Sequence, residues 1–150
     1  MRPFPKLALA VALALVTLCA TVLAQPPPPP PPVYVVIVHP KNPSTVVTRG
    51  FLEDAFLKKI TRWPNDQVIR PVDLVASSPV RRKFTEDVLS RSVEGVKGYW
   101  QQRIFSGRDV PPPELDNDED VVRYVLKHEA AVGYVSGRAN LGEAKTVDVK

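Results

Sequence analysis

The segment VYVVIV, residues 33–38, is a continuous run of apolar and mostly β-branched residues that ends at His39 and Pro40. A strand with one face in water alternates apolar and polar residues, whereas a run without alternation is typical of a strand covered on both faces. The segment therefore predicts a buried strand of an α/β sheet.

Four helices are predicted by their capping residues and by the spacing of their apolar residues. Ser78 followed by Pro79 is a strong helix start, because a serine caps the first turn and proline suits the first helical position. Apolar residues three and four positions apart predict the inward face of each helix. The first two helices begin at Thr48, with Leu52, Ala55 and Phe56 facing inward, and at Ser78, with Val80, Phe84 and Val88 facing inward. The third begins at Ser92, with Val93, Val96, Trp100 and Ile104 facing inward. The fourth begins at Asn117 or Asp116, with Val121, Val122, Val125 and Leu126 facing inward.

Three further strands complete the pattern. Residues 68–72 predict a short strand at a sheet edge or a strand end, because Pro71 cannot donate a ladder hydrogen bond. Residues 131–135 and 146–149 predict two short strands near the C-terminus. The order is strand, helix, strand, three helices and two strands, which indicates an α/β fold.

Residues 1–24 have the composition of a secretory signal peptide. Arg2 and Lys6 precede an uncharged run, residues 7–23. The segment ends with Val22 at position −3 and Ala24 at position −1, which is the pattern of a signal-peptidase cleavage site. The sequence predicts cleavage after Ala24 and a periplasmic or secreted protein. An uncleaved membrane anchor is the alternative, since the apolar run is close to the minimum length of a membrane span.

A proline-rich linker, residues 25–32, follows the signal segment and contains seven consecutive prolines. Such a run adopts the extended polyproline II conformation and acts as a stiff spacer. The remaining residues, 33–150, have ordinary globular composition. Their number suits one domain and is too small for a large multidomain enzyme.

The formal net charge of +4 belongs partly to the signal segment. Without Arg2 and Lys6 the chain has 18 basic and 16 acidic residues, so a nucleic-acid partner has little electrostatic support. The only cysteine, Cys19, also lies in the signal segment. The rest of the chain therefore has no disulfide and must be held together by packing.

The start of the helix at Ser78 is the candidate binding site for an anion. Unpaired backbone N–H groups at a helix N-terminus attract anions, and Ser77, Ser78 and Arg81 would add two hydroxyls and a guanidinium. A helix cap beside a solvated arginine explains the same residues without a ligand.

The other polar groups favour structural roles. Residues 116–120 include four acids but lack the glycine of a calcium loop, and their charge suits the start of a helix. His39 and His128 are far apart in sequence and no metal-ligand or nucleophile motif accompanies them, so no catalytic site, no metal site and no cofactor are predicted. Residues 99–108 mix aromatic and basic side chains as base-stacking surfaces do, but their helical spacing favours a place in the core.

Several strings of residues, in order and at matching spacing over residues 33–149, resemble phosphate ABC transporter substrate-binding proteins. The first string, FLKKITRW at residues 56–63, is similar to the family's IFLGK-x-TRW, and Ser78 with Arg81 and Phe84 is similar to the helix opening after the family's second strand. Tyr99-Trp100 with IFSGR at residues 104–108 is similar to the YW…IFSGRG of short, stand-alone relatives. The last string, AVGYV at residues 131–135, is similar to the family's GAIGYV.

The resemblance implies that residues 33–150 form a single lobe of the type II periplasmic-binding-protein fold, with a small mixed sheet flanked by helices. A full receptor of the family closes two lobes on phosphate, which its second lobe holds with a segment of the form Arg-x-Asp-Gly-Ser-Gly-Thr. At the corresponding positions this chain keeps only the serine, Ser78, and Arg81 lies one turn further along the helix.

The expected function is that of an exported, non-enzymatic binding module that takes phosphate or a similar oxyanion weakly through Ser77, Ser78 and Arg81. The alternative is a protein-interaction module, associated with the cell envelope, that has lost phosphate binding. An exported enzyme is disfavoured, because the sequence contains no recognisable set of acid/base or nucleophilic residues.

Overall fold

The strand β1 (Tyr34–Val38) lies at the centre of a five-stranded sheet. In this computed structural model, which describes residues 27–150, β1 runs antiparallel to β6 (Ala131–Ser136) on one side and to β7 (Lys145–Val149) on the other. Residues 36–38 are each at most 2% exposed, so both faces of β1 are covered. The predicted strand is confirmed over residues 34–38, but only residues 36–38 are fully buried, and Val33 lies outside the strand and is 55% exposed.

Short strands extend the sheet at both edges. β2 (Val46–Val47) adds in parallel to β7, and β3 (Arg70–Pro71) adds in parallel to β6, which gives the order β2-β7-β1-β6-β3. The strand predicted over residues 68–72 is therefore shorter than expected, and its proline does lie on an edge strand. A separate parallel pair, β4 (Asp73–Leu74) and β5 (Glu114–Leu115), was not predicted.

Four helices form where the capping residues predict them. Each capping side chain accepts a hydrogen bond from a backbone N–H of the first turn, which satisfies one of the donors that a helix start leaves free. The helices are α1 (Arg49–Phe56), α2 (Pro79–Leu89), α3 (Val93–Phe105) and α4 (Asp118–Lys127), capped by Thr48, Ser78, Ser92 and Asn117 respectively.

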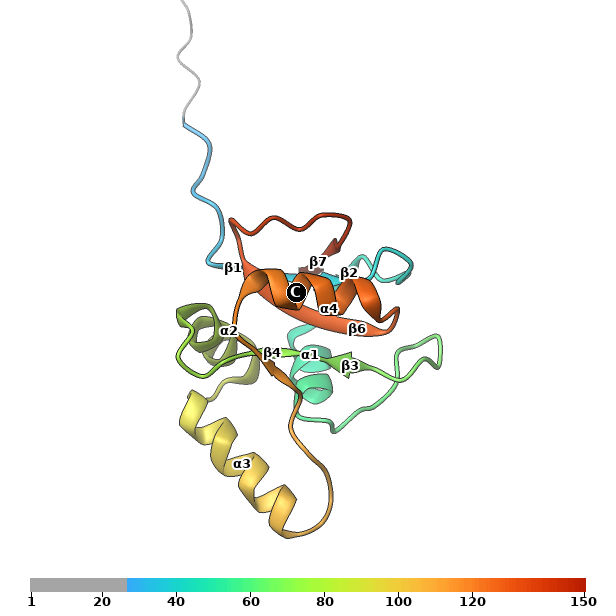
Figure 1. Cartoon of the computed structure of the whole chain (residues 1–150), viewed down its shortest axis with the longest axis vertical. Helices are drawn as coiled ribbons and strands as arrows, with labels where there is room; N and C mark the ends of the chain where they lie inside the picture. Colours follow the sequence, from blue (N-terminus) through green and yellow to red (C-terminus); the bar gives the residue numbers. More distant parts are fainter. Residues whose placement is uncertain (1–26) are drawn as a thin grey trace, which may run out of the picture. The chain divides into compact units, whose positions relative to one another are not determined.

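The helices α2 and α4 cover opposite faces of the sheet (Figure 1). Gly133 and Tyr134 are neighbours on β6, so they face opposite sides of it. α4 packs on the side of Gly133, where Val121 lies against the strand. On the other side the ring of Phe84, from α2, stacks on Tyr134 with 3.8 Å between ring centroids. The core is therefore continuous on both sides of β6.

Helix α3 projects beyond the sheet and its covering helices, at the lower end of the view in Figure 1. Val96 and Trp100 are buried, and the Tyr99 hydroxyl donates to the Leu57 carbonyl at 2.8 Å. Ile104 is 51% exposed, so its predicted inward position is wrong. The last turn of α3 extends past the surface that buries the first turns, which leaves the end of the predicted stripe in solvent.

The predicted signal peptide, residues 1–24, lies outside the described residues. In the linker, residues 27–32 are exposed and have no regular secondary structure. Within the described part of the chain, no helix has the length and apolar character needed to cross a membrane.

Candidate functional site

The first turn of α2 carries the residues predicted to bind an anion. Ser78 has an extended backbone, and its Oγ accepts a hydrogen bond from the Arg81 N–H at 3.3 Å. Ser77 is exposed and Ser78 is half-buried. The two serines thus lie together at the helix start, where Ser78 acts as the cap.

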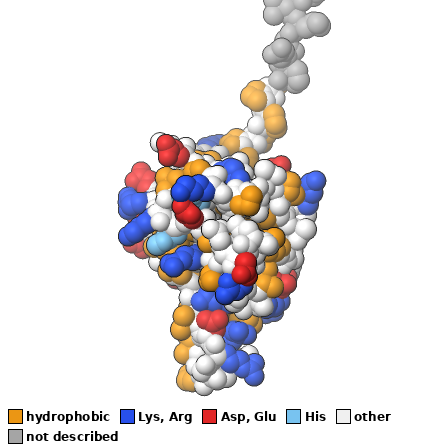
Figure 2. Space-filling view, turned by 90° about the vertical axis from the view of Figure 1, so that its right-hand side faces the viewer, with side chains coloured by type: hydrophobic (Ala, Val, Ile, Leu, Met, Phe, Trp, Pro, Cys, Tyr) orange, Lys and Arg blue, Asp and Glu red, His pale blue; other side chains and the backbone are white. Residues whose placement is uncertain are grey.

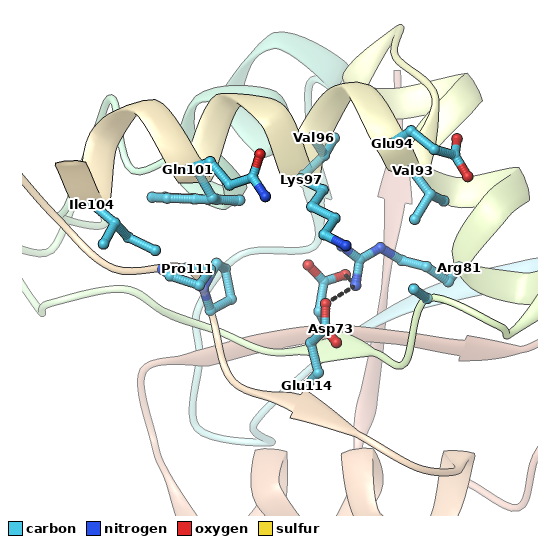
Figure 3. A pocket seen from close by; sticks show the side chains of 13 residues that line it. Asp73, Arg81, Val93, Glu94, Val96, Lys97, Gln101, Ile104, Pro111 and Glu114 are labelled. Carbon is cyan, nitrogen blue, oxygen red and sulfur yellow. Dashed lines mark hydrogen bonds and ion pairs between the residues drawn. The ribbon is translucent and has the colours of Figure 1, made fainter.

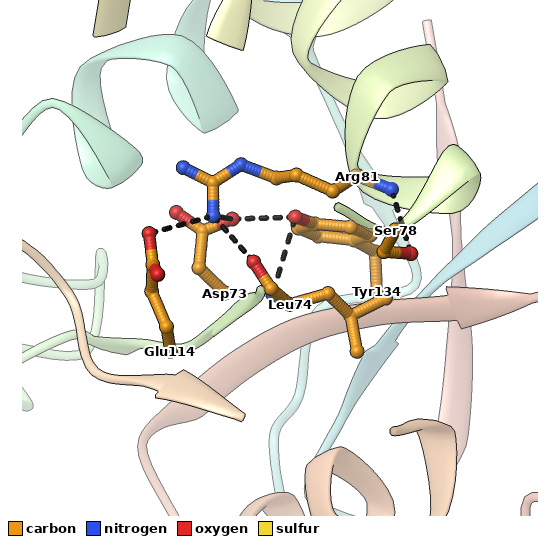
Figure 4. A network of polar contacts seen from close by, with 6 residues as sticks. All are labelled: Asp73, Leu74, Ser78, Arg81, Glu114 and Tyr134. Carbon is orange, nitrogen blue, oxygen red and sulfur yellow. Dashed lines mark hydrogen bonds and ion pairs between the residues drawn. The ribbon is translucent and has the colours of Figure 1, made fainter. Parts of the chain in front are cut away.

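The side chain of Arg81 runs away from this helix start into the protein (Figure 4). Its Nη1 donates to the Leu74 carbonyl at 2.6 Å and lies 3.0 Å from Oδ1 of Asp73 and 3.4 Å from Oε1 of Glu114. The side chains of Arg81 and Asp73 are only 4% and 5% exposed. The fold therefore separates the guanidinium from the two serines and pairs it with a buried carboxylate.

Asp73 is held from a second direction by Tyr134, whose hydroxyl donates to Oδ1 of Asp73 at 2.5 Å. The pKa of Asp73 is raised to about 6, mainly by burial and to a lesser extent by the charge of Glu114, while the charge of Arg81 and the Tyr134 hydrogen bond offset part of this rise. Burial also raises the pKa of Tyr134. Asp73 therefore changes its charge in the mildly acidic range, unlike an exposed aspartate.

A pocket of about 440 Å³ opens beside this network, between α3 and the segment that leads into β5 (Figure 3). This volume falls within the range of small-molecule sites. Arg81 Nε is buried and has no hydrogen-bond partner among the described residues, so the guanidinium keeps a spare donor beside the pocket. The apolar wall is formed by Val93, Val96, Trp100, Ile104, Pro111 and Pro112, and the charged lining residues are Asp73, Arg81, Glu94, Lys97 and Glu114.

The acidic residues 116–120 take the structural role predicted for them. Asn117 caps α4 and three acidic residues occupy its first turn, where negative charge suits the helix dipole. One of them, Asp118, also accepts a hydrogen bond from the Ser136 N–H at 3.2 Å, and Asp120 pairs with Arg123. The Asp118 contact ties the start of α4 to the end of β6, whereas the Asp120–Arg123 pair lies within the helix.

The two histidines follow different elements of the fold. His39 follows β1, and its Nδ1 accepts a hydrogen bond from the Lys41 N–H at 3.1 Å. His128 ends α4 beside the ring of Tyr124, and its pKa is lowered by burial and then by the nearby cations. Across residues 27–150, no group of three or more histidine, cysteine, aspartate or glutamate side chains is placed to hold a metal ion.

Sequence reasoning missed Asp73, Tyr134 and Glu114. One signal was available, because Asp73 stands alone among the apolar residues of the stretch PVDLV, 71–75, and a charged residue in such a stretch is buried only with a partner. The identity of the partner was not available, since Tyr134 is 61 residues away in the chain and only the folded sheet brings the two together.

No protein-family model and no curated protein sequence matches the chain. Solved structures do match it. An ABC-type phosphate transport receptor from Vibrio cholerae has a TM-score of 0.60 and 23% identity, with 77% of this chain and 45% of that chain covered. A Clostridium perfringens protein, assigned to the phosphate ABC transporter substrate-binding proteins and solved with bound phosphate, has a TM-score of 0.61 and 24% identity, with 77% and 44% covered.

A third match is PstS from Borrelia burgdorferi, with a TM-score of 0.60, 12% identity and coverage of 79% of this chain and 47% of that chain. The chain thus spans less than half the length of each of these proteins. At such identities the structural similarity shows the fold alone. It therefore confirms the fold that the resemblance in the sequence implies. The chain has the fold of one lobe of a type II periplasmic binding protein, as found in phosphate ABC transporter substrate-binding proteins.

Proposed function

We propose that this chain is an exported, non-enzymatic binding module. The fold supports a binding role, because the solved proteins that share it are binding proteins of phosphate transport. The composition of residues 1–24 supports export to the periplasm or beyond the cell, since it follows the pattern of a secretory signal peptide.

The ligand that the geometry supports best is a protein in the same compartment rather than free phosphate. The observation that carries this inference is the small number of convergent donors at the start of α2. Pro79 has no N–H, the Arg81 N–H is bonded to Ser78, and the Arg81 guanidinium is paired with Asp73. Tight oxyanion capture needs many convergent donors in a site shielded from water.

Titration calorimetry of the purified protein with phosphate and with sulfate tests this proposal. We expect no saturable heat at ligand concentrations up to about 1 mM, where a receptor with micromolar affinity would be saturated. A micromolar dissociation constant that is lost in Ser78→Ala but kept in Ser92→Ala would overturn it. The two variants each remove one helix cap, so they share any loss of stability, of about 1 kcal/mol.

Weak oxyanion binding through Ser77, Ser78 and Arg81 is the second candidate function. Two observations favour it: Ser77 is exposed at the start of α2, and the similar Clostridium perfringens protein was solved with phosphate. Arg81 would first have to leave Asp73. Because the pKa of Asp73 is about 6, protonation of Asp73 near that pH would loosen this ion pair.

This second candidate makes a separate prediction for the pH dependence of binding. Sulfate keeps its charge across the range from about pH 5 to pH 7, so a change in its affinity reports on the protein. The oxyanion site predicts tighter sulfate binding at the lower pH, where Asp73 is neutral and Arg81 is free to turn toward the serines. Equal affinity at both pH values, or no binding at either, would exclude Arg81 as a ligand of the anion.

A further inference from the structure

The pocket beneath α3 combines an apolar wall with a charged end (Figure 3). Its volume of about 440 Å³ lies in the lower part of the range for small-molecule sites, so it suits a compact ligand. The wall includes the buried side chain of Trp100, together with Val93, Val96 and Ile104 from the same helix. A ligand that fills this pocket therefore has an apolar part.

The charged end holds two carboxylates that share one guanidinium. Asp73 contacts Tyr134 and Arg81 through Oδ1 alone. Glu114 contacts the same guanidinium through Oε1. In the described part of the chain, no hydrogen bond or ion pair engages the second oxygen of either carboxylate. These two oxygens are placed to accept hydrogen bonds from a cationic group of a ligand.

A second cation reaches the same end of the pocket from α3. Lys97 lines the pocket, and its side chain extends from the helix toward Arg81 and Asp73 (Figure 3). The two carboxylates pair with Arg81 rather than with Lys97, so the Lys97 ammonium is available to a ligand. It offers a place for an anionic group beside the place for a cationic one.

The charges at this end balance each other. The two carboxylates are matched by the Arg81 guanidinium and the Lys97 ammonium, while Glu94, the fifth charged residue of the lining, points away from them (Figure 3). Figure 2 shows acidic and basic side chains close together at the lower end of the molecule, where α3 lies. Such a site does not select an ion of one sign, whereas a ligand that carries both charges is held by both.

We propose that this pocket binds a free α-amino acid with an apolar side chain, such as leucine or phenylalanine. The ammonium of the ligand lies between Asp73 and Glu114, its carboxylate lies at Lys97, and its side chain packs against the wall that contains Trp100. This ligand goes beyond the protein partner proposed above, because an internal residue of a protein chain carries neither charge. The expected dissociation constant at pH 7 is on the order of 100 µM.

Titration calorimetry of the purified protein with leucine and with phenylalanine tests the proposal. Three analogues each lack one part of leucine: leucinamide lacks the carboxylate, isocaproate lacks the ammonium, and glycine lacks the apolar side chain. We expect each analogue to bind at least tenfold more weakly than leucine, because each leaves one part of the site without its partner.

A pair of lysine variants tests the assigned carboxylate contact. Lys97→Gln should weaken leucine binding at least tenfold, because it removes the cation that holds the carboxylate. Lys127→Gln is the matched control, since Lys127 is exposed on α4 and lies outside the pocket, and its variant should bind leucine as the parent does.

The two tryptophans report where the ligand binds. Trp100 lines the pocket and Trp63 does not. In the NMR spectrum of the ¹⁵N-labelled protein, the indole N–H of Trp100 should therefore shift with leucine while that of Trp63 stays in place. Saturable binding that shifts Trp63 and leaves Trp100 unchanged would place the amino acid elsewhere and overturn the proposal.

The titrations also have outcomes that contradict the proposal. No saturable heat with either amino acid at about 5 mM, or leucine binding that Lys97→Gln leaves unchanged, would overturn it. Leucinamide that binds as tightly as leucine would assign the pocket to the amino terminus of a peptide, and isocaproate that does so would assign it to a simple carboxylate. Both results overturn the proposal, and neither bears on the phosphate titration, which tests the proposed function separately.

Discussion

Asp73 and Arg81 form an ion pair in which both side chains are almost completely shielded from water. Such a pair is weak evidence for net stability, because each charge loses its hydration on burial. The pair matters because removal of either charge leaves the other buried without a partner, which lowers the stability of the fold. The pair also decides what Arg81 is able to bind, since a guanidinium at 3.0 Å from a buried carboxylate is not a free anion ligand.

Removal of Arg81 should be strongly destabilising. Arg81→Met leaves Asp73 buried without its cation, and we expect the free energy of unfolding to fall by about 3 to 5 kcal/mol. Urea denaturation measures this loss. The double variant Asp73→Leu with Arg81→Met, which removes both charges, should recover most of it. A loss below about 1 kcal/mol in the single variant would show that the ion pair is not buried in solution.

The protonation of Asp73 should make the protein more stable in mild acid. The folded-state pKa of about 6 lies above the ordinary value of 3.8, so between these values the folded protein binds more protons than the unfolded chain. Stability therefore rises as the pH falls through 6, and this contribution is lost as the pH rises again. We expect the free energy of unfolding to be higher at pH 5 than at pH 7 by about 1 kcal/mol.

The variant Asp73→Asn supplies the control for this pH dependence. An amide keeps an oxygen that accepts hydrogen bonds from Tyr134 and Arg81, but it does not titrate. Thermal or urea unfolding of Asp73→Asn should lack the gain between pH 7 and pH 5. An identical gain in the variant and the parent would assign the effect to other groups.

The glycines in two elements show how differently β6 and α3 are packed. A Cβ at Gly133 of β6 would lie 2.8 Å from methyl carbons of Val121 and Val72, so the strand has no room for a side chain. A Cβ at Gly98 of α3 would meet nothing within 4 Å. β6 lies in the close-packed centre, whereas this position of α3 faces open space.

Alanine at these two positions should therefore have opposite effects. Gly133→Ala should lower the free energy of unfolding by about 1 to 3 kcal/mol, because it overpacks the contact between β6 and α4. Gly98→Ala should raise it by about 0.5 to 1 kcal/mol, because alanine favours a helix interior. Chemical denaturation of both variants under one condition gives the comparison, and stabilisation by Gly133→Ala would contradict the described packing.

At the level of elements, local signals in the sequence predicted most of the fold. The capping residues Thr48, Ser78 and Ser92 mark helix starts correctly, because a cap depends only on its own turn. The short pair β4 and β5 could not be predicted, since two-residue strands have no periodicity. Ile104 was misplaced for a related reason: periodicity gives the face of a helix but not where the neighbouring surface ends.

At the scale of the whole molecule, the fold was easier to infer than the site. Strings such as AVGYV, residues 131–135, point to the fold because they report buried strands. The site depends on the direction that a long side chain takes in the folded protein, which the local sequence does not determine. Arg81 sits at the predicted place in α2, yet its guanidinium belongs to a network with Asp73 and Tyr134 that forms only when distant strands meet.

The central claim is that this single lobe is a binding module in which the start of α2 has too few convergent donors to bind phosphate tightly. The most direct test is an amide NMR titration of the ¹⁵N-labelled protein with phosphate up to about 10 mM. We predict no saturable shifts at the amides of Ser77, Ser78, Val80 and Arg81. Saturable phosphate shifts at these amides would contradict the claim.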